Sequence, residues 1–417
     1  MRVLRNLLNR PASNADTSTR TIDYLVGGLR ISLDDDSTTP GPKSHIQHFT
    51  GALTESGHKV RIYFANDTPG LQRFKRLGEG STSDKTPFAL ILSDLIRIAA
   101  ALWAGAWLFG RSIASTPPGI LYERVAVFQS LAAFHARKRG AIRVLESNGL
   151  MAKETARDRN GIYFERLASE LERRAYKRAD LIVAISEKLA DQIVSFAGVP
   201  RNKILVVPNA IPSDLISVQR QNNGEFIVGF SGSLVPWQQL EKLISAFDRC
   251  RKTDDKFEQQ VVIEIIGDGP VKESLIRLVE DLGLNQIVRF LPRMPQYELF
   301  NRMATWSVGF AGHEKSSSNV MYHSPLKMYE YAGLGLSAVS TMTPDAAALK
   351  AAGMKVHYFD DLQELSDALL KSFYDPISQP ENDKQRLEIY SKHSWRDRTD
   401  KVLAVIATRF EMMPCER

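Results

Sequence analysis

Short apolar segments alternate with longer amphipathic segments along the chain, a pattern typical of parallel sheets covered by helices. In the first half, this pattern predicts strands at residues 22–27, 59–64, 119–122, 142–146, 181–185 and 204–207. It predicts helices at about 44–57, 161–178 and 186–197. The last of these begins with Ser186 as its N-cap.

A second alternating series follows a polar stretch after Pro208. Its predicted strands are 226–231, 261–266, 287–291, 306–310, 336–340 and 355–358. Its predicted helices are about 237–250, 270–282, 296–304, 325–333, 344–352, 361–373 and 394–412. The fold class expected from both series is α/β, with two doubly wound, Rossmann-like domains.

The 417 residues divide at these changes of pattern. We expect a flexible tail, an N-terminal domain, a linker, a C-terminal domain and a last helix at 1–20, 21–212, 213–224, 225–392 and 393–417. No short-period repeat, low-complexity tract or heptad run interrupts this organisation.

Composition excludes several classes of protein. Hydrophobic residues make up 43% and charged residues 24%, which excludes wholesale disorder, a collagen-like fibre and a polytopic membrane protein. Lys and Arg exceed Asp and Glu by 54 − 48 = +6, which favours anionic partners. No nucleic-acid-binding motif accompanies this charge, so nucleic acid is not an expected partner. The two cysteines, Cys250 and Cys415, support neither a disulfide framework nor a zinc site, and a reducing cytoplasm fits best.

One apolar segment, 98–110, bears on localisation. Its thirteen residues are too short for a membrane-spanning helix, which needs about 20. A helix buried against a sheet is the favoured interpretation. The alternative is a helix in the membrane interface, anchored by Trp103, Trp107 and Phe109. The N-terminus has no apolar core of the kind found in a secretory signal.

The strongest candidate for chemistry is the segment 324–335, SPLKMYEYAGLG. Ser324 and Pro325 predict a helix start, whose unpaired N–H groups and dipole suit a diphosphate. Lys327 adds a positive charge in the same turn. Glu330 is placed to accept paired hydrogen bonds from vicinal ribose hydroxyls, although a lone glutamate on a helix is more often a solvated surface residue.

Other candidates follow predicted strands, where ligands bind in parallel sheets. The glycine turns at 232–237 and 267–270 are each, alone, more often structural. In the segment 41–46, Ser44 as an N-cap competes with a phosphate-facing glycine loop, and a lone His45 is more often packed or solvated than catalytic. Polar residues at 123–124 and 146–149 are candidates for acceptor binding, against plain loop capping.

These segments resemble, in order, the GT-B glycosyltransferases of family 4. In the first half the resemblance rests on ADLIVAIS at 179–186, VPNA at 207–210, Tyr122-Glu123-Arg124 and 145–148, the last two typical of a bacterial branch. In the second half it rests on 226–237, 266–270, 288–299 and the SPLKMYEYAGLG segment. The likeness spans about residues 22–410.

The resemblance implies two Rossmann-like domains facing a cleft, with the last helix crossing back to the N-terminal domain. It implies metal-independent, retaining transfer of a sugar from a nucleotide diphosphate sugar held mainly by the second domain. No cofactor beyond this co-substrate is implied. Glu330 matches the family glutamate that holds the ribose, and Gly41 matches the glycine of an N-terminal phosphate loop.

The site residues predicted from the pattern and the resemblance together fall into three groups. Lys327, Glu330 and His45 are the expected catalytic residues. The expected nucleotide-sugar contacts are Gly41, Gly232, Ser233, Gln238, Gly267, Ser324, Pro325, Leu326, Lys327 and Glu330. The expected acceptor contacts are Lys43, Glu123, Arg124, Glu146 and Asn148. No metal ligand is expected, since the eight histidines do not cluster at metal spacing.

The chain departs from the family pattern at several places. Tyr322 stands where many members have the first Glu of a Glu-x7-Glu motif. Ser233, Gln238 and Gln239 stand where many members have Arg and then Lys-Gly or His-Gly. Losing two cations removes charge-assisted contacts to a diphosphate leaving group. Lys327, and as a second candidate Lys315 from the neighbouring loop, could compensate for this loss.

The expected function is therefore retaining hexosyl transfer in bacterial polysaccharide, glycolipid or glycosylated-metabolite synthesis. The expected partners are a nucleotide diphosphate sugar and a glycan, lipid-linked or small-molecule acceptor. The expected location is the cytoplasm. Peripheral contact with the inner membrane follows only from the alternative interpretation of 98–110 as an interfacial helix. Two alternatives remain: a catalytically impaired partner or scaffold of an active transferase, and a nucleotide-sugar epimerase of similar fold.

Overall fold

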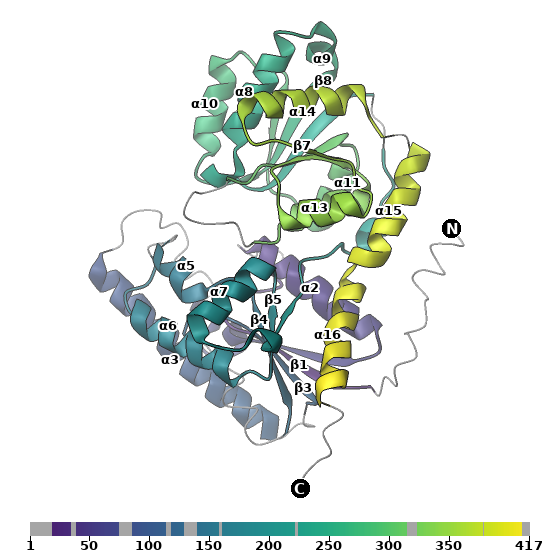
Figure 1. Ribbon diagram of the computed structural model, residues 1–417. Coiled ribbons are helices and arrows are strands. Elements are labelled where there is room, and N and C mark those ends of the chain that lie inside the picture. The colour runs from purple at the N-terminus through teal and green to yellow at the C-terminus, as the bar shows by residue number, and fades with distance from the viewer. Residues whose placement is uncertain are drawn as a thin grey trace. The chain divides into compact units, whose positions relative to one another are not determined.

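The computed structural model describes residues 19–34, 39–74, 86–113, 118–128, 140–157, 161–221, 224–314, 323–377 and 379–410. The chain forms two compact units. Unit 1 comprises Met1–Pro208, Tyr322–Ser324 and Arg398–Arg417, and unit 2 comprises Asn209–Met321 and Pro325–Asp397. Figure 1 shows a sheet flanked by helices in each unit, as the alternating sequence pattern predicts.

Unit 1 is built on a parallel sheet of six strands in the order β2-β1-β3-β4-β5-β6. The strands are β1 (Thr21–Val26), β2 (Lys59–Phe64), β3 (Ile120–Arg124), β4 (Ile142–Ser147), β5 (Leu181–Ala184) and β6 (Ile204–Val206). The helices are α2 (Pro40–Glu55), α3 (Pro87–Ile113), α5 (Met151–Arg157), α6 (Glu165–Arg178) and α7 (Glu187–Ala197). Strands β3 and β5 are buried throughout, as central parallel strands require.

Unit 2 contains a second parallel six-stranded sheet, in the order β12-β11-β10-β7-β8-β9. Its strands are β7 (Phe226–Ser233), β8 (Val261–Asp268), β9 (Val288–Leu291), β10 (Val308–Ala311), β11 (Ser337–Ser340) and β12 (Val356–Tyr358). Its helices are α8 (Leu240–Arg251), α9 (Asp255–Gln260), α10 (Lys272–Asp281), α11 (Gln296–Met303), α12 (Leu326–Leu334), α13 (Pro344–Ala351), α14 (Leu362–Tyr374) and α15 (Gln379–His393). The predicted α/β class with two Rossmann-like domains is confirmed.

Helix α16 (Trp395–Phe410) contains residues of both units. Its residues from Arg398 onward belong to unit 1, where the Arg409 guanidinium donates to the Asn202 carbonyl at 2.7 Å. Apart from Tyr322–Ser324, which belong to unit 1, the chain passes to unit 2 after Pro208 and returns to unit 1 after Asp397.

Several element boundaries differ from those predicted. Helix α2 begins at Pro40 rather than at Ser44. Proline is tolerated there because the N–H groups of a first helical turn have no acceptor within the helix, so the missing N–H of proline costs no hydrogen bond. The predicted linker at 213–224 lies within unit 2 and contains the 3₁₀ helix η5 (Asp214–Ser217). Helix α15 was not predicted, because its sequence is polar and has little apolar periodicity.

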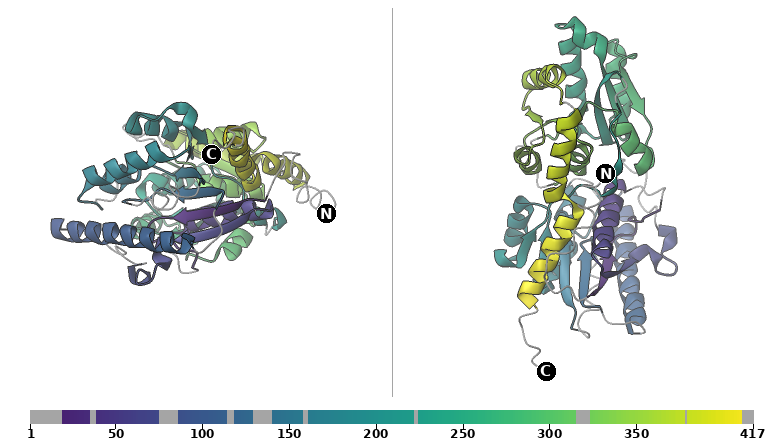
Figure 2. Two further views of the ribbon diagram at one scale, coloured as in Figure 1. Left: turned by 90° about the horizontal axis from the view of Figure 1, so that it is seen from below. Right: turned by 90° about the vertical axis from the view of Figure 1, so that its right-hand side faces the viewer.

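Helix α3 is twice as long as the segment predicted at 98–110. It runs for 27 residues, from Pro87 to Ile113, on the outside of unit 1 (Figure 2). Its stretch Pro87–Arg111 is long and apolar enough to cross a membrane by length and composition, so the argument that the segment is too short was wrong. The apolar pattern did not predict residues 87–97 as part of this helix, because Asp94 and Arg97 interrupt the apolar run.

Candidate functional site

The strongest site of unit 2 lies at the carboxyl ends of β7 and β10. Strand β7 opens the unit, and its neighbours are β8 on one side and β10 on the other. The chain order reverses between β7 and β10, which is the topological switch point where open parallel sheets bind ligands. The segment after β7 and the start of α12, which follows β10, supply the residues of this site.

Glycines allow two backbone segments to meet at this end of the sheet. Gly232 and Gly267 pair across β7 and β8, and both have φ near the left-handed range, at +147° and +146°. A Cβ at Gly267 would lie 1.9 Å from the Gly232 carbonyl oxygen, so no other residue fits there. The Leu234 N–H then donates to the Asp268 carbonyl at 3.0 Å, which joins the two turns.

Lys327, in the first turn of α12, lies under this glycine turn. Its Nζ donates to Gln238 Oε1 at 2.7 Å and lies 3.9 Å from the centre of the Phe230 ring. A Cβ at Gly232 would lie 3.6 Å from Nζ, so the ammonium group reaches the backbone of the turn. The side chain is only 9% exposed, and burial lowers the pKa of Lys327 to about 7, with Glu330 acting in the opposite direction.

Glu330 lies one turn further along α12 and retains some exposed surface. Burial of its carboxyl group raises the pKa of Glu330 to about 7, while Lys327 lowers it and Asp214 raises it further. The two groups therefore form a coupled acid–base pair on one helix face. Next to them, the Tyr331 hydroxyl donates to the Phe310 carbonyl at 2.9 Å and fixes α12 against β10.

The beginning of α12 offers N–H groups without acceptors inside the helix. Pro325 is its N-cap and makes no side-chain capping bond. Leu326 and Lys327 are the first residues of the helix, so their N–H groups and the helix dipole create a positive end. The buried Ser324 precedes this turn. The predicted association of Pro325, Leu326, Lys327 and Glu330 in one helix start is present.

The structure gives the two glutamines after Trp237 distinct positions. Gln238 is buried and holds the Lys327 ammonium group, so it orients a cation where many relatives of the resembled family supply one themselves. Gln239 has φ +56°, a left-handed conformation that glycine adopts most easily. Its Oε1 is buried with no hydrogen-bond partner among the described residues. Ser233, in contrast, is exposed.

A second cluster forms in unit 1 around Glu146, at the end of β4. Arg124 and Asn148 each donate to Glu146 Oε1 at 2.7 Å, and His45 Nε2 lies 3.0 Å from the same oxygen. The Tyr24 hydroxyl donates to Glu146 Oε2 at 3.0 Å. The predicted residues His45, Arg124, Glu146 and Asn148 are therefore brought together by α2, β3 and β4.

The carboxylate at the centre of this cluster is ionised. Glu146 is only 1% exposed, and burial alone would raise its pKa. The neighbouring His45 and Arg124, with the hydrogen bonds of His45 and Asn148, instead hold the pKa of Glu146 well below its usual range. A carboxylate with this many partners fixes the side chains around it.

Three predicted residues of unit 1 lie outside this contact set. The Lys43 ammonium group donates to the Asp34 carbonyl at 2.9 Å. Gly41 lies within the first turn of α2 and not in a loop, which corrects the expectation of a phosphate loop at this glycine. Glu123 is a buried residue of β3.

Sequence reasoning missed the aromatic floor of the Glu146 cluster. Tyr24 and Tyr122 are paired across β1 and β3, with ring centres 5.1 Å apart. Phe49 of α2 packs 4.8 Å from Tyr122. The tyrosine hydroxyls gave no motif, but the parallel pairing of β1 with β3 would have placed both rings on one side of the sheet. The alternative cation Lys315 and the position Tyr322 lie outside the described residues.

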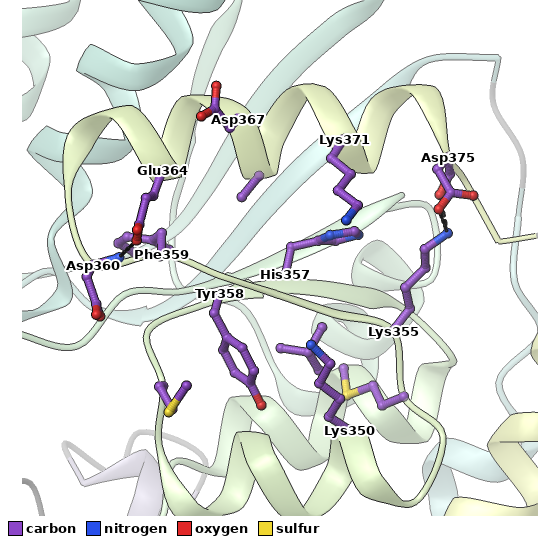
Figure 3. Close-up of a pocket in the computed structure, with 14 residues that line it drawn as sticks. Lys350, Lys355, His357, Tyr358, Phe359, Asp360, Glu364, Asp367, Lys371 and Asp375 are labelled. Atoms are coloured by element: carbon purple, nitrogen blue, oxygen red, sulfur yellow. Dashed lines mark hydrogen bonds and ion pairs between the residues drawn. The ribbon is translucent and has the colours of Figure 1, made fainter.

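A separate hollow of about 710 Å³ lies beside the edge strand β12 in unit 2 (Figure 3). It is lined by Lys350, Lys355, His357, Lys371 and residues of α14, with Lys355 paired to Asp375 at 2.6 Å. Burial, together with the nearby lysines, lowers the pKa of His357 to about 4. The hollow contains none of the residues at the β7–β10 switch point. Within the described residues, no group of three or more His, Cys, Asp or Glu side chains is placed to hold a metal ion.

Two family models match consecutive parts of the chain. The model of glycosyltransferase family 4 matches residues 41–215, and the model of glycosyl transferases group 1 matches residues 213–342. The chain is a family 4-like GT-B glycosyltransferase. The family models therefore support glycosyl transfer as the class of reaction.

Solved structures share the fold of this glycosyltransferase at low sequence identity. Sucrose-phosphate synthase from Thermosynechococcus elongatus is 12% identical, with a TM-score of 0.67 over 94% of this chain and 100% of that one. The Anabaena protein HepE, solved with UDP and glucose, is 14% identical, with a TM-score of 0.58 over 93% and 100%. The lipopolysaccharide outer core galactosyltransferase WaaB is 15% identical, with a TM-score of 0.57 over 93% and 99%. No curated protein sequence matches the chain closely enough to count as a relative.

Proposed function

We propose that this glycosyltransferase moves a hexose from a nucleoside diphosphate sugar to a glycan, glycolipid or small-molecule acceptor, with retention at the anomeric carbon and without a metal. The observation that carries the proposal is the buried Lys327 ammonium group, held by Gln238 at the start of α12 and one turn from Glu330. This arrangement pairs a site for a diphosphate with a site for vicinal ribose hydroxyls. HepE, which has the same fold, binds UDP and glucose.

Unit 2 is the proposed donor side. When the bond between sugar and diphosphate breaks, negative charge accumulates on the leaving phosphate. The Lys327 ammonium group and the N–H groups of the first α12 turn stabilise that charge, and burial strengthens the effect. Glu330 accepts hydrogen bonds from the ribose and fixes the nucleotide. The glycine turn at Gly232 and Gly267 lets the phosphates approach the backbone.

Unit 1 is the proposed acceptor side. His45, Arg124 and Asn148 surround the ionised Glu146, so their positions are fixed before any acceptor arrives. In this proposal His45 contacts the reacting acceptor hydroxyl, and Arg124 and Asn148 bind neighbouring hydroxyls. The buried carboxylate of Glu146 orients the three side chains and does not itself bind the acceptor.

The donor site is tested by thermal stabilisation with UDP, GDP, ADP and TDP. A ligand present at 100 times its Kd adds about 2.7 kcal/mol to the free energy of unfolding. We expect one nucleotide to raise the Tm of the wild type, and Glu330→Gln to lose most of that rise. The exposed Glu280→Gln, on α10 of the same unit, is the matched control and keeps the rise. If no nucleotide stabilises the wild type at millimolar concentration, the proposed donor site is wrong.

A second candidate is a catalytically impaired protein that supports an active transferase. The exposed Ser233 and the uncharged Gln238 favour it, since both stand where many members of the resembled family have cations. Measuring free nucleotide released from a donor sugar, with and without acceptor, separates the candidates. A transferase releases nucleotide only with an acceptor, whereas a scaffold or an epimerase releases none.

A further inference from the structure

Helix α3 exposes an apolar face, whereas an ordinary surface helix exposes a polar one. Between Phe88 and Gly110 every exposed position is apolar or glycine: Phe88, Ala89, Leu92, Leu95, Ala99, Leu102, Trp103, Ala106 and Gly110. These positions recur every three or four residues, so they form one stripe along the helix, called here the outer stripe. At 1.5 Å per residue the outer stripe is about 35 Å long.

The charged residues of the same stretch are turned away from solvent or paired. Asp94 is completely buried and accepts hydrogen bonds from the backbone N–H groups of Tyr163 and Phe164, at 2.8 and 2.9 Å. Arg97 pairs with Asp94 at 3.1 Å and donates to the Gly161 carbonyl at 2.7 Å. The helix therefore uses its polar side chains to fix itself to unit 1 and leaves its large apolar side chains outside.

The opposite face of α3 packs in the core of unit 1. Ala100, Ala104 and Leu108 are buried in one cluster with Leu25 of β1 and Leu121 of β3. A helix that crossed a bilayer would have to leave this cluster and expose the sheet beneath it. The packing therefore indicates a helix that lies along a surface, although its length would allow it to span a membrane.

The exposed fractions of the outer stripe are large for apolar side chains. Phe88 is 75% exposed, Leu102 58%, Leu95 52%, and both Leu92 and Trp103 50%. Tyr163, whose backbone N–H binds Asp94, is 51% exposed, and Leu167, four residues further along the chain, is 45% exposed. A contiguous apolar surface of this kind is rarely left in water.

We propose that α3 docks this glycosyltransferase on a lipid bilayer with anionic headgroups, lying in the interface with its outer stripe toward the acyl chains. The stripe carries no hydrogen-bonding side chain that a protein partner would have to satisfy. Even the Trp103 indole N–H is used, since it donates to the Pro69 carbonyl at 3.0 Å and leaves the apolar ring outside. Trp and other aromatic side chains are typical anchors at a membrane–water interface.

Charge at the margin of the stripe complements anionic headgroups. Arg111 ends the apolar stretch, with its guanidinium 4.8 Å from the Trp107 ring, and Arg73 lies in the neighbouring η2 helix (Gln72–Phe74). Arg166 is exposed beside Leu167. Among the described residues, Asp67 and Glu165 are the exposed acidic residues next to these segments. Together with the net charge of +6 on the chain, this gives an apolar surface with a predominantly basic margin.

Docking of this kind would bring the transferase to acceptors held in the bilayer, which favours the lipid-linked class of acceptor. That step rests on the proposed function, whereas the docking itself does not. Binding to vesicles is measured without any donor or acceptor, so a failed donor site and a failed docking site give separate results.

The experiment is flotation of the full chain with unilamellar vesicles, either of phosphatidylcholine alone or with about a third of phosphatidylglycerol, at low and high salt. We expect the wild type to float with the anionic vesicles. The double variant Leu95→Glu/Leu102→Glu should lose binding by about tenfold or more, because charge on the apolar face opposes burial in the interface. Leu102→Phe, which keeps the position apolar, should bind like the wild type.

Two further variants keep the result interpretable. Tyr297→Glu, at a 76% exposed position on α11 of unit 2, is the matched control for adding charge, and it should float like the wild type. Circular dichroism and the Tm of each variant show that it folds. The proposal is overturned if the wild type does not float. It is also overturned if the double variant floats equally well, or if its only change is from dimer to monomer, which would make the stripe an interface between two copies.

Discussion

Burial changes the acid–base behaviour of Lys327. On an exposed helix surface its ammonium group would be permanently charged, but here it lies among Phe230, the Gly232 backbone and the Gln238 amide. Desolvation brings its pKa to about 7. An anion that enters the site restores the lost solvation and favours the charged form. If the proposed donor site is correct, Lys327 couples binding of a diphosphate to uptake of a proton.

This coupling predicts how donor affinity depends on pH. Above pH 7 the free Lys327 is mostly neutral, so binding has to take up a proton, and Kd should rise by up to about tenfold per pH unit until the pKa of the complex is reached. Calorimetric titration of a nucleoside diphosphate sugar between pH 6 and 9 measures it. A nucleoside diphosphate sugar is used instead of a free nucleotide because both of its phosphates are esterified and do not titrate in this range.

Lys327→Met provides the control for this prediction. The variant should bind the donor more weakly at pH 6 and should lose the decline of affinity above pH 7. Glu330 titrates in the same range, and its ionisation would act in the opposite direction by favouring the ribose contact. A donor affinity that rises from pH 7 to pH 9 in the wild type would mean that Glu330, and not Lys327, dominates.

At Gln239 the backbone conformation makes a non-glycine residue unfavourable for stability. Its φ of +56° costs a non-glycine residue about 1 kcal/mol or more, and its buried Oε1 adds a desolvation cost. Glycine removes both costs but makes the unfolded chain more flexible. We expect Gln239→Gly to stabilise the protein by about 1 kcal/mol relative to Gln239→Ala, measured by urea denaturation. Equal stability of the two variants would show that no strain is stored there.

At the scale of elements, glycines determine how closely helices and aromatic side chains approach the sheet of unit 2. A Cβ at Gly229 in β7 would lie 1.9 Å from Trp306, and one at Gly309 in β10 would lie 2.4 Å from Tyr331. Trp306 is fully buried, and its indole N–H donates to the buried Glu264 at 2.9 Å. Because Gly229 and Gly309 have no side chain, Trp306 and Tyr331 can pack directly against these two strands.

This packing predicts a large cost for adding one methyl group. Gly229→Ala forces Trp306 out of its place and should destabilise unit 2 by about 3 kcal/mol or more. The comparison is Gly51→Ala in the middle of α2, where a Cβ meets nothing within 4 Å. Alanine there should stabilise by about 0.5–1 kcal/mol, because it favours the helix. Thermal denaturation of both variants measures the contrast, and a similar Tm for the two would contradict the account.

At the scale of the whole molecule, the two units have separate cores and separate electrostatics. Unit 1 contains a buried carboxylate, Glu146, whose pKa is held below its usual range by cationic and hydrogen-bonding neighbours. Unit 2 contains a buried pair, Lys327 and Glu330, that both titrate near pH 7. The units therefore respond to pH in different ranges, and unfolding is not expected to be one two-state transition.

Acid should destabilise unit 1 through Glu146. A carboxyl group with a lowered pKa contributes stability at neutral pH that is lost as the pH falls below its unfolded value of about 4.5, at up to about 1.4 kcal/mol per pH unit. Calorimetry between pH 3 and 7 should show this loss in the wild type. In Glu146→Gln the transition of unit 1 should be less stable at pH 7 and should depend less on pH below 4.5. Glu280→Gln in unit 2 should leave that dependence unchanged.

The sequence by itself predicted the order of the strands along the chain and the residues of the proposed donor site. Alternation of apolar and amphipathic segments predicted every strand of both sheets within a few residues, because parallel strands buried on both faces require continuous apolar runs. The motif of Ser324, Pro325, Lys327 and Glu330 indicated an anion site because a helix start and its charges are local in the chain. Residues of one turn need no tertiary structure to be brought together.

Tertiary structure decided everything that depends on burial and on pairing between distant segments. Only packing made Gln238 the partner of Lys327, placed Tyr24 and Tyr122 under Glu146, and lowered or raised the pKa of each buried group. It also decided the face of α3, where Asp94 lies inside and Leu102 outside, since periodicity alone assigns the apolar side to the core. Desolvation and the choice of face are properties of the folded surroundings and are not encoded in any single stretch of the chain.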